Sequence, residues 1–166
     1  MNQIEIFAPA SVANVSCGFD VLGFCLEPIG DYMKITQKKT PGVEIGKISG
    51  AELPMDPMKN VASVAVFSLL ESLPSKFGYI IDIDKRIKPG SGIGSSAASA
   101  AGAVFAVNEL MGRPLSRKEL VQHAIAGESL ASGSSHADNL APVLLGGFTL
   151  VRSNKTLDIV KLPCPQ

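Results

Sequence analysis

The chain has 166 residues, which suits one ordinary domain, and its 46% hydrophobic and 18% charged content is typical of a packed globular core rather than a disordered chain. Fifteen basic residues cancel fifteen acidic ones, which argues against nucleic acid and anionic membrane surfaces as partners. No apolar run approaches the ~20 residues that a membrane span requires, and residues 1–5 lack the pattern of a secretion signal, so we expect neither a membrane protein nor export.

The first third of the chain reads as β structure. Ile4, Ile6 and Ala8 alternate with neighbours on the opposite face, which predicts a half-buried strand over residues 3–8. Residues 9–20 are small and polar, and they predict a long structured loop, a kind of segment that often carries function. Further strands are predicted over residues 21–26, 32–36 and 43–48.

The rest of the chain alternates helices with two more strands. Asn60 is the predicted N-cap of a helix that ends before Pro74, and a strand over residues 79–84 follows. A glycine-rich loop over residues 89–96 leads into a helix over 97–111. Ser116 and Glu119 form the capping box of another helix, over 116–131, and residues 144–151 return to strand. Because most strands precede the helices, we expect an α+β fold.

The cysteines indicate a reducing compartment. Cys17, Cys25 and Cys164 are odd in number and lie far apart, which is typical of free thiols in a cytoplasmic protein. His123 and His136 are the only imidazoles, so a zinc site would need an unusual combination of ligands.

The glycine-rich loop between a strand and a helix is an arrangement that suits an anion. Glycines let the backbone approach a phosphate closely, and the N–H groups of the following first helical turn point toward it. The loop lacks the Gly-Lys-Ser/Thr ending of a Walker A motif, the spacing of a dinucleotide fingerprint and the pattern of a nucleophile elbow. From shape alone, a plain glycine-rich turn before a small-residue helix remains the alternative.

The residues of this loop also resemble a known signature. Residues 89–98, Pro-Gly-Ser-Gly-Ile-Gly-Ser-Ser-Ala-Ala, resemble the ATP-binding motif of the GHMP kinase superfamily, with Ile93 in place of the usual leucine. Within that superfamily, residues 8–23 and 136–148 resemble two stretches of the homoserine kinase family. The three motifs occur in the same order and cover nearly the whole chain.

The resemblance implies a fold, a reaction and a nucleotide site. The fold would be the GHMP kinase N-terminal domain, which is ribosomal protein S5 domain 2-like, with a mixed or antiparallel sheet packed against helices. The reaction would be ATP-dependent phosphorylation of the side-chain hydroxyl of L-homoserine, a step of threonine biosynthesis. The residues that would bind ATP are Pro89, Gly90, Ser91, Gly92, Ile93, Gly94, Ser95, Ser96, Ala97, Ala98, Ser99 and, near the adenine, Asn60.

Magnesium would accompany the nucleotide, because phosphoryl transfer depends on charge stabilisation. Mg²⁺ takes hard oxygen ligands, one or two of them from the protein. By resemblance, Ser96 and Glu128 would be the metal-coordinating pair, and Glu128 would be catalytic through it. From its position alone, Glu128 is better interpreted as an exposed helix acid.

The amino-acid substrate would bind to residues of the two other motifs. Asn14, Asp20 and His136 match substrate-binding positions of the family, and Asp20 suits the ammonium group. Asn139 is the second expected catalytic residue. It stands where related kinases carry an aspartate proposed as general base, and because an amide has no useful basicity we expect it to orient the hydroxyl and stabilise charge. His136 is the alternative base.

Other functions remain open at this stage. The chain could be another small-alcohol GHMP kinase, for mevalonate for example, or a hydrolase that uses Ser134 or Ser135 beside His136. GHMP kinases are usually close to twice this size, so residues 1–166 are expected to form the N-terminal ATP-binding domain, with the C-terminal GHMP domain absent. A fragment that binds ATP without catalysis is therefore a third alternative, and a homodimer is the association state to test.

Overall fold

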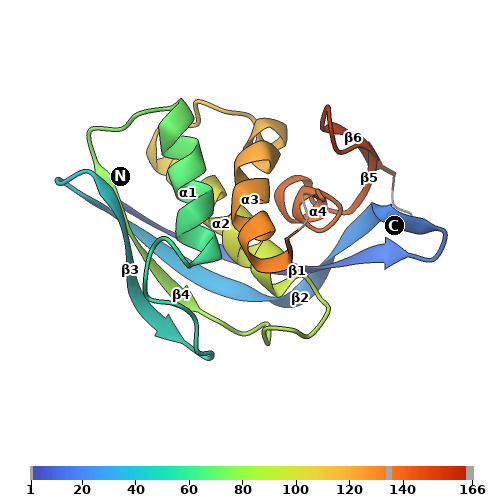
Figure 1. Cartoon of the computed structure of the whole chain (residues 1–166), viewed down its shortest axis with the longest axis horizontal. Helices are drawn as coiled ribbons and strands as arrows, with labels where there is room; N and C mark the ends of the chain where they lie inside the picture. The colour runs from blue at the N-terminus through green and yellow to red at the C-terminus, as the bar shows by residue number, and fades with distance from the viewer. Residues whose placement is uncertain (1, 134–135, 164–166) are drawn as a thin grey trace.

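The computed structural model describes residues 2–133 and 136–163, which form a six-stranded sheet with four helices on one of its faces (Figure 1). This arrangement confirms the predicted α+β class with a mixed sheet. The strands are β1 (Gln3–Val15), β2 (Gly18–Lys38), β3 (Gly42–Ser49), β4 (Gly78–Asp84), β5 (Phe148–Ser153) and β6 (Asp158–Leu162). The helices are α1 (Val61–Ser72), α2 (Ser95–Leu110), α3 (Arg117–Ser132) and α4 (Leu140–Leu145).

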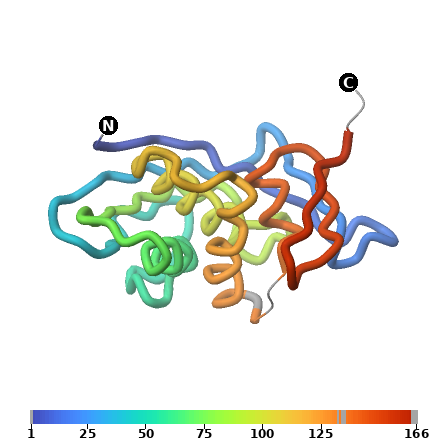
Figure 2. Tube along the Cα trace, turned by 90° about the horizontal axis from the view of Figure 1, so that it is seen from above, coloured from blue at the N-terminus to red at the C-terminus, as the bar shows by residue number. Residues whose placement is uncertain are grey.

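β1 and β2 form one long antiparallel hairpin, which corrects the prediction of a loop over residues 9–20 and of a break between residues 26 and 32. Pro9 is tolerated in the strand because the register shifts between Pro9 and Ala10, leaving residues 27–29 of β2 as a bulge. Figure 2 shows the tip of the hairpin projecting beyond the helices, at the end of the molecule where β5 and β6 lie.

β2 is the central strand of the sheet. On one side it pairs with β1, and on the other its later residues pair with β4 and its earlier residues with β5. The β3–β4 pair is parallel, and the other strand pairs are antiparallel. β2 therefore joins β4, which precedes the glycine-rich loop in the chain, to β5, which follows α4.

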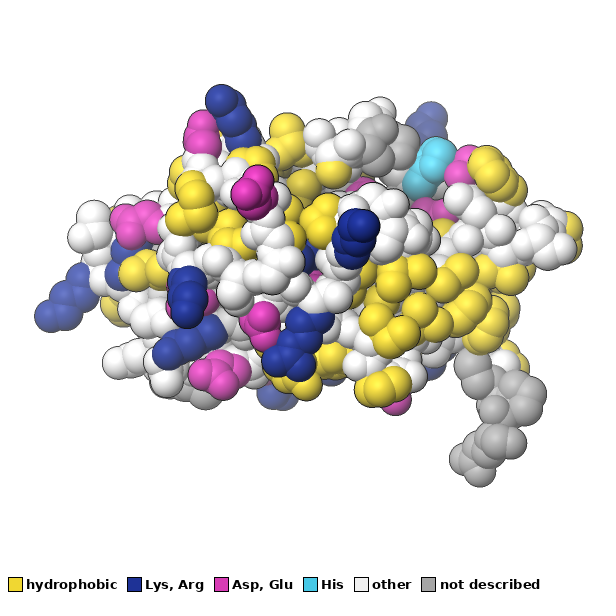
Figure 3. Space-filling view, turned by 90° about the horizontal axis from the view of Figure 1, so that it is seen from below, with side chains coloured by type: hydrophobic (Ala, Val, Ile, Leu, Met, Phe, Trp, Pro, Cys, Tyr) yellow, Lys and Arg dark blue, Asp and Glu magenta, His cyan; other side chains and the backbone are white. Residues whose placement is uncertain are grey.

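α2 is the central helix and is buried along most of its length, because its sequence consists largely of alanine and other small residues. At Gly102 a Cβ would lie only 2.8 Å from the sulfur of Met33 and 2.9 Å from the Cβ of Ala8, so the helix packs directly on β1 and β2. Within the described ranges, no helix combines the length and the apolar character needed to cross a membrane. On the face drawn in Figure 3, side chains of both charge signs are interspersed, in keeping with the balanced composition.

The helix caps follow the sequence closely, whereas the last part of the chain differs from the prediction. Asn60 caps α1, and Ser116 and Glu119 form both bonds of the capping box of α3. The strand expected over residues 144–151 is wrong in its first half: residues 140–145 form α4, and the strand begins at Phe148. β6 was not predicted; it pairs with β5 as a short edge strand.

We expect the stability of the fold to decrease in mild acid because of His123, which is buried between α1 and α3. Its Nδ1 lies 3.0 Å from the hydroxyl of Ser68, and burial lowers the pKa of the imidazole below its usual 6.5. The folded state therefore favours the neutral ring, while the unfolded chain takes up a proton as the pH falls through 6.5. Urea unfolding should show a lower free energy of unfolding at pH 5.5 than at 7.5. The decrease should be smaller in His123→Gln, and an equal decrease in both proteins would contradict this assignment.

Candidate functional site

The glycine-rich loop has a backbone that other residues rarely adopt. Gly90, Gly92 and Gly94 all lie in the left-handed region, with φ values of 74°, 78° and 66°. This alternation folds residues 89–94 into a compact turn whose last residue, Gly94, is the N-cap of α2. Successive backbone N–H groups in such a turn form a concave site for an anion.

Gly94 is also the point at which three segments meet. A Cβ on this residue would lie 2.1 Å from the Ser11 hydroxyl of β1 and 3.1 Å from the side-chain oxygen of Asn139, which precedes α4. Ser11 is fully buried and donates a 2.9 Å hydrogen bond to that same Asn139 oxygen. The absence of a side chain at Gly94 therefore lets the loop, β1 and the start of α4 come together.

A cleft of about 640 Å³ opens beside the loop and contains most of the predicted site residues. The predicted residues that line it are Asn14, Asn60, Pro89, Gly90, Gly92, Gly94, Ser95, Ser96, Ser99, Glu128 and Asn139. The rest of the lining is Leu53, Pro54, Lys59, Val61, Lys85, Leu130 and Ala131. Ser91, Ile93, Ala97, Ala98, Asp20 and His136 are not part of this lining.

The N-terminus of α2 faces this cleft without a side-chain cap. Gly94 makes no capping hydrogen bond, since it has no side chain. The Ser95 hydroxyl donates a 3.0 Å hydrogen bond to the carbonyl of Ile87, so this hydroxyl is engaged within the protein. The backbone N–H of Ser95 is therefore the group of this residue that can donate to a ligand. An uncapped helix N-terminus attracts anions through its N–H groups and its dipole.

Ser96 and Glu128 bring two hard oxygens together across the cleft. The Ser96 hydroxyl donates to Oε1 of Glu128 at 3.0 Å, joining α2 to α3. Burial raises the pKa of Glu128 above its usual 4.5, the Ser96 hydrogen bond lowers it, and nearby Asp138 raises it further. Among the described residues, no three His, Cys, Asp or Glu side chains cluster as a metal cage. Mg²⁺ bound with a nucleotide needs only one or two protein oxygens, so this pair fits it.

Asn14, Asp20 and His136 form a connected group at the tip of the β1–β2 hairpin. The Asn14 side-chain oxygen accepts a 2.8 Å hydrogen bond from the Asp20 N–H, and Asp20 Oδ1 lies 3.1 Å from Nδ1 of His136. Asn14 and Asp20 both have left-handed backbones, with φ values of 58° and 59°. The Asp20 and His136 side chains are 38% and 42% exposed, so they remain accessible to a solute.

Asn60 is the N-cap of α1, as predicted, and its side chain lies at the cleft. Its side-chain oxygen accepts from the N–H of Ala62 as the α1 cap, and its amide donates to the carbonyl of Pro54 at 2.9 Å. The residue also lines the cleft, next to Leu53 and Val61. The cap thus fixes the direction of a side chain at the cleft wall.

Lys85 lines the cleft but is not among the residues that the sequence predicts for the site. It follows β4 directly, is 4% exposed and forms an ion pair with the fully buried Asp31 of β2. Burial lowers the pKa of Lys85 below 10.5, and the charges of Asp31 and Glu128 oppose that change. The sequence feature that could have indicated Lys85 is its position, directly after an apolar strand and four residues before the loop.

The hydrolase interpretation needs Ser134 or Ser135 as the nucleophile beside the Asp20–His136 pair. Ser134 and Ser135 lie outside the described residues, as does Cys164. Cys17 and Cys25 are free thiols.

The comparisons with known proteins agree on one family. Residues 60–147 match the family model described as the GHMP kinases N terminal domain. The chain is 45% identical to a homoserine kinase of Chlorobium phaeovibrioides, covering 100% of this chain and 56% of that protein. The crystal structure of homoserine kinase from Cytophaga hutchinsonii superposes with a TM-score of 0.94 at 48% identity, covering 99% of this chain and 53% of that one.

More distant structures share the fold. Mevalonate kinase of Methanococcus jannaschii superposes with a TM-score of 0.68 at 18% identity, over 98% of this chain and 56% of that one. The chain spans about half the length of the curated relatives and solved structures that it matches.

Proposed function

Because the chain belongs to the GHMP kinase family, we propose that its cleft binds Mg-ATP and that it serves a kinase that phosphorylates the side-chain hydroxyl of L-homoserine. One observation carries the nucleotide site: three left-handed glycines lead into an uncapped helix N-terminus at the wall of a cleft of about 640 Å³. The homoserine kinase relatives at 45% and 48% identity support the choice of substrate.

The nucleotide would lie with its triphosphate against the loop. Backbone N–H groups of residues 92–96 would hold the phosphate oxygens, and the dipole of α2 would favour their charge. The adenine would lie toward Asn60, where the apolar side chains of Leu53 and Val61 offer surface to a purine. Binding of this kind positions the γ-phosphoryl group, which is the main task in phosphoryl transfer.

Ser96 and Glu128 would hold the magnesium ion, which neutralises charge on the phosphates when bound. Glu128 must be ionised for this task. Burial raises its pKa and so disfavours the carboxylate, and a neighbouring cation would reverse that preference. The same burial that raises the pKa also strengthens the attraction between the carboxylate and a divalent cation.

The alcohol substrate would bind between the hairpin tip and the start of α4. Asp20 would pair with the ammonium group, and Asn14 and His136 would hydrogen-bond its other polar groups. Asn139, held by Ser11, would orient the hydroxyl. The products are a phosphate monoester, ADP and one proton. Since the transition state is loose, the hydroxyl proton can leave late, without a strong base at Asn139.

We propose that residues 1–166 form the ATP-binding half of the enzyme and that a second GHMP domain completes it, in the cytoplasm. The extent of the relatives supports this division, because the chain covers 56% and 53% of them. The free thiols Cys17 and Cys25 suit a reducing compartment.

An assay of ATP-dependent phosphorylation, comparing this chain with a version extended to the length of its relatives, tests the proposal. We expect the extended protein to prefer homoserine over mevalonate by about 100-fold or more in kcat/KM, as expected when a site pairs the substrate's charged groups. The 166-residue chain should bind Mg-ATP with little turnover. A preference for mevalonate would refute the substrate, equal activity of both chains would refute the need for a second domain, and absence of ATP binding would refute the site.

A further inference from the structure

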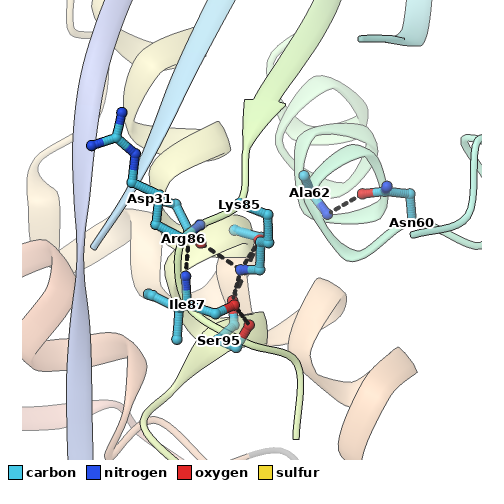
Figure 4. A network of polar contacts seen from close by, with 8 residues as sticks. Asp31, Asn60, Ala62, Lys85, Arg86, Ile87 and Ser95 are labelled. Carbon is cyan, nitrogen blue, oxygen red and sulfur yellow. Dashed lines mark hydrogen bonds and ion pairs between the residues drawn. The ribbon is translucent and has the colours of Figure 1, made fainter. Parts of the chain in front are cut away.

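Lys85 and Asp31 form a buried ion pair next to the glycine-rich loop. Their side chains are 2% and 0% exposed; Lys85 directly follows β4, and Asp31 lies in β2 (Figure 4). Removing two charges from water is costly, and such pairs are weak contributors to stability unless further hydrogen bonds satisfy them. The partners of this pair therefore indicate what it does.

Every donor of the Lys85 ammonium is engaged within the protein. Its Nζ donates to Asp31 Oδ2, to the carbonyl of Ser95 at 2.6 Å and to the Ser99 hydroxyl at 3.0 Å. An ammonium has three N–H groups, so these bonds use all of them. Although Lys85 lines the cleft, it has no donor left for a phosphate oxygen.

Asp31 binds the other end of the loop. Its Oδ1 accepts hydrogen bonds from the N–H groups of Arg86 and Ile87, both at 2.8 Å. The carbonyl of Ile87 in turn accepts from the Ser95 hydroxyl at 3.0 Å. Figure 4 shows Asp31, Lys85, Ile87 and Ser95 joined in one network, so residues 85–87 before the loop are tied to residues 95–99 after it.

We propose that Lys85 and Asp31 are positioning residues for the triphosphate, an inference that rests on the proposed ATP site. They set the distance between the two ends of the glycine-rich loop, so that the N–H groups of the loop and of the first turn of α2 stay aimed at the phosphates. Neither side chain touches the nucleotide. A preorganised phosphate site needs such support, because glycines at 90, 92 and 94 leave the loop backbone with little stiffness of its own.

Three variants and three ligands test this inference: Asp31→Asn, Lys85→Met and the double variant, each titrated with ATP, inorganic triphosphate and adenosine. Triphosphate lacks the base and sugar, and adenosine lacks the phosphates. We expect each single variant to weaken ATP and triphosphate about tenfold or more, with adenosine changed less than about twofold. The double variant should lose no more ATP affinity than the single variant that binds ATP more weakly, since all three variants break the same ion pair.

The controls separate this inference from the proposed function and from misfolding. Lys38→Met removes a lysine from the exposed ion pair with Glu44, away from the cleft, and should leave all three affinities unchanged. Because a lone buried charge can unfold a single variant, the double variant, in which neither charge remains, decides the result in that case.

Three outcomes would overturn the inference. If Lys85→Met weakens ATP while Asp31→Asn does not, Lys85 contacts the phosphates directly. If the melting temperatures fall while the ATP affinity is unchanged, the pair serves stability alone. If the unsubstituted chain binds neither ATP nor triphosphate, the proposed function fails as well, which distinguishes that failure from the other two.

Discussion

Replacing Glu128 by glutamine should reduce turnover about 10²-fold to 10³-fold in the extended protein, the range for loss of one group that stabilises transition-state charge. Glutamine keeps the shape and can still accept the hydrogen bond from Ser96, but it cannot supply an anionic oxygen to magnesium. In the 166-residue chain, the same change should remove most of the magnesium dependence of ATP affinity. Steady-state kinetics at saturating magnesium and calorimetric titration of Mg-ATP measure these two effects.

The same substitution should stabilise the ligand-free chain. The pKa of Glu128 is raised above 4.5 by burial, so at neutral pH the ionised form opposes folding, and this cost disappears as the pH falls through the raised value toward 4.5. Glutamine carries no such cost, so its melting temperature should exceed that of the original chain at pH 7.

The exposed helix acid Glu71 provides a matched control for Glu128. Glu71→Gln should change neither the melting temperature nor the magnesium dependence, since the residue is not part of the cleft. Normal turnover of Glu128→Gln would exclude the metal role.

Replacing Gly94 by alanine should weaken ATP binding strongly. A left-handed φ of 66° costs an alanine about 1–2 kcal/mol, and the new Cβ would lie 2.1 Å from the Ser11 hydroxyl. Relief of that clash must move the loop away from β1 and disturb the hydrogen bond between Ser11 and Asn139. We expect the ATP dissociation constant to rise about 100-fold, equivalent to about 2.7 kcal/mol, by calorimetric titration.

A substitution at Gly112 separates the cost of a left-handed backbone from the steric clash that alanine would cause at position 94. It has a φ of 87° and open space where a Cβ would be, and it lies outside the cleft. Gly112→Ala should lower stability by about 1 kcal/mol with unchanged ATP affinity. Within the loop, Gly90→Ala also meets no neighbouring atom, so it should weaken ATP less than Gly94→Ala does. Equal losses at positions 90 and 94 would show that contact with Ser11 is not the cause.

Much of the fold could be predicted because its determinants are local. The caps of α1 and α3 depend on residues two or three positions apart, and the strands of residues 43–48 and 79–84 have clear apolar patterns. The glycine-rich loop was found for the same reason, since its glycines and the following small-residue helix are contiguous.

The errors occurred where pairing with distant residues overrides local composition. Residues 9–15 contain a proline and few strand formers, yet they form a strand because β2 offers a continuous partner. Residues 144 and 145 are apolar and continue into a strand pattern, but they end a helix whose residues Leu140 and Leu144 are buried. Short apolar runs do not distinguish a buried helix from a strand.

The sequence by itself determined the α+β class, the caps and the contiguous glycine-rich loop, because each depends on residues that are neighbours in the chain. Only the tertiary structure decided how that loop is held. Ser11 reaches Asn139 across 128 positions, Ser96 reaches Glu128 across 32, and Lys85 reaches Asp31 across 54. Such contacts form only when the sheet and helices have packed, because the favourable burial of the core is what brings distant polar groups to hydrogen-bond distance.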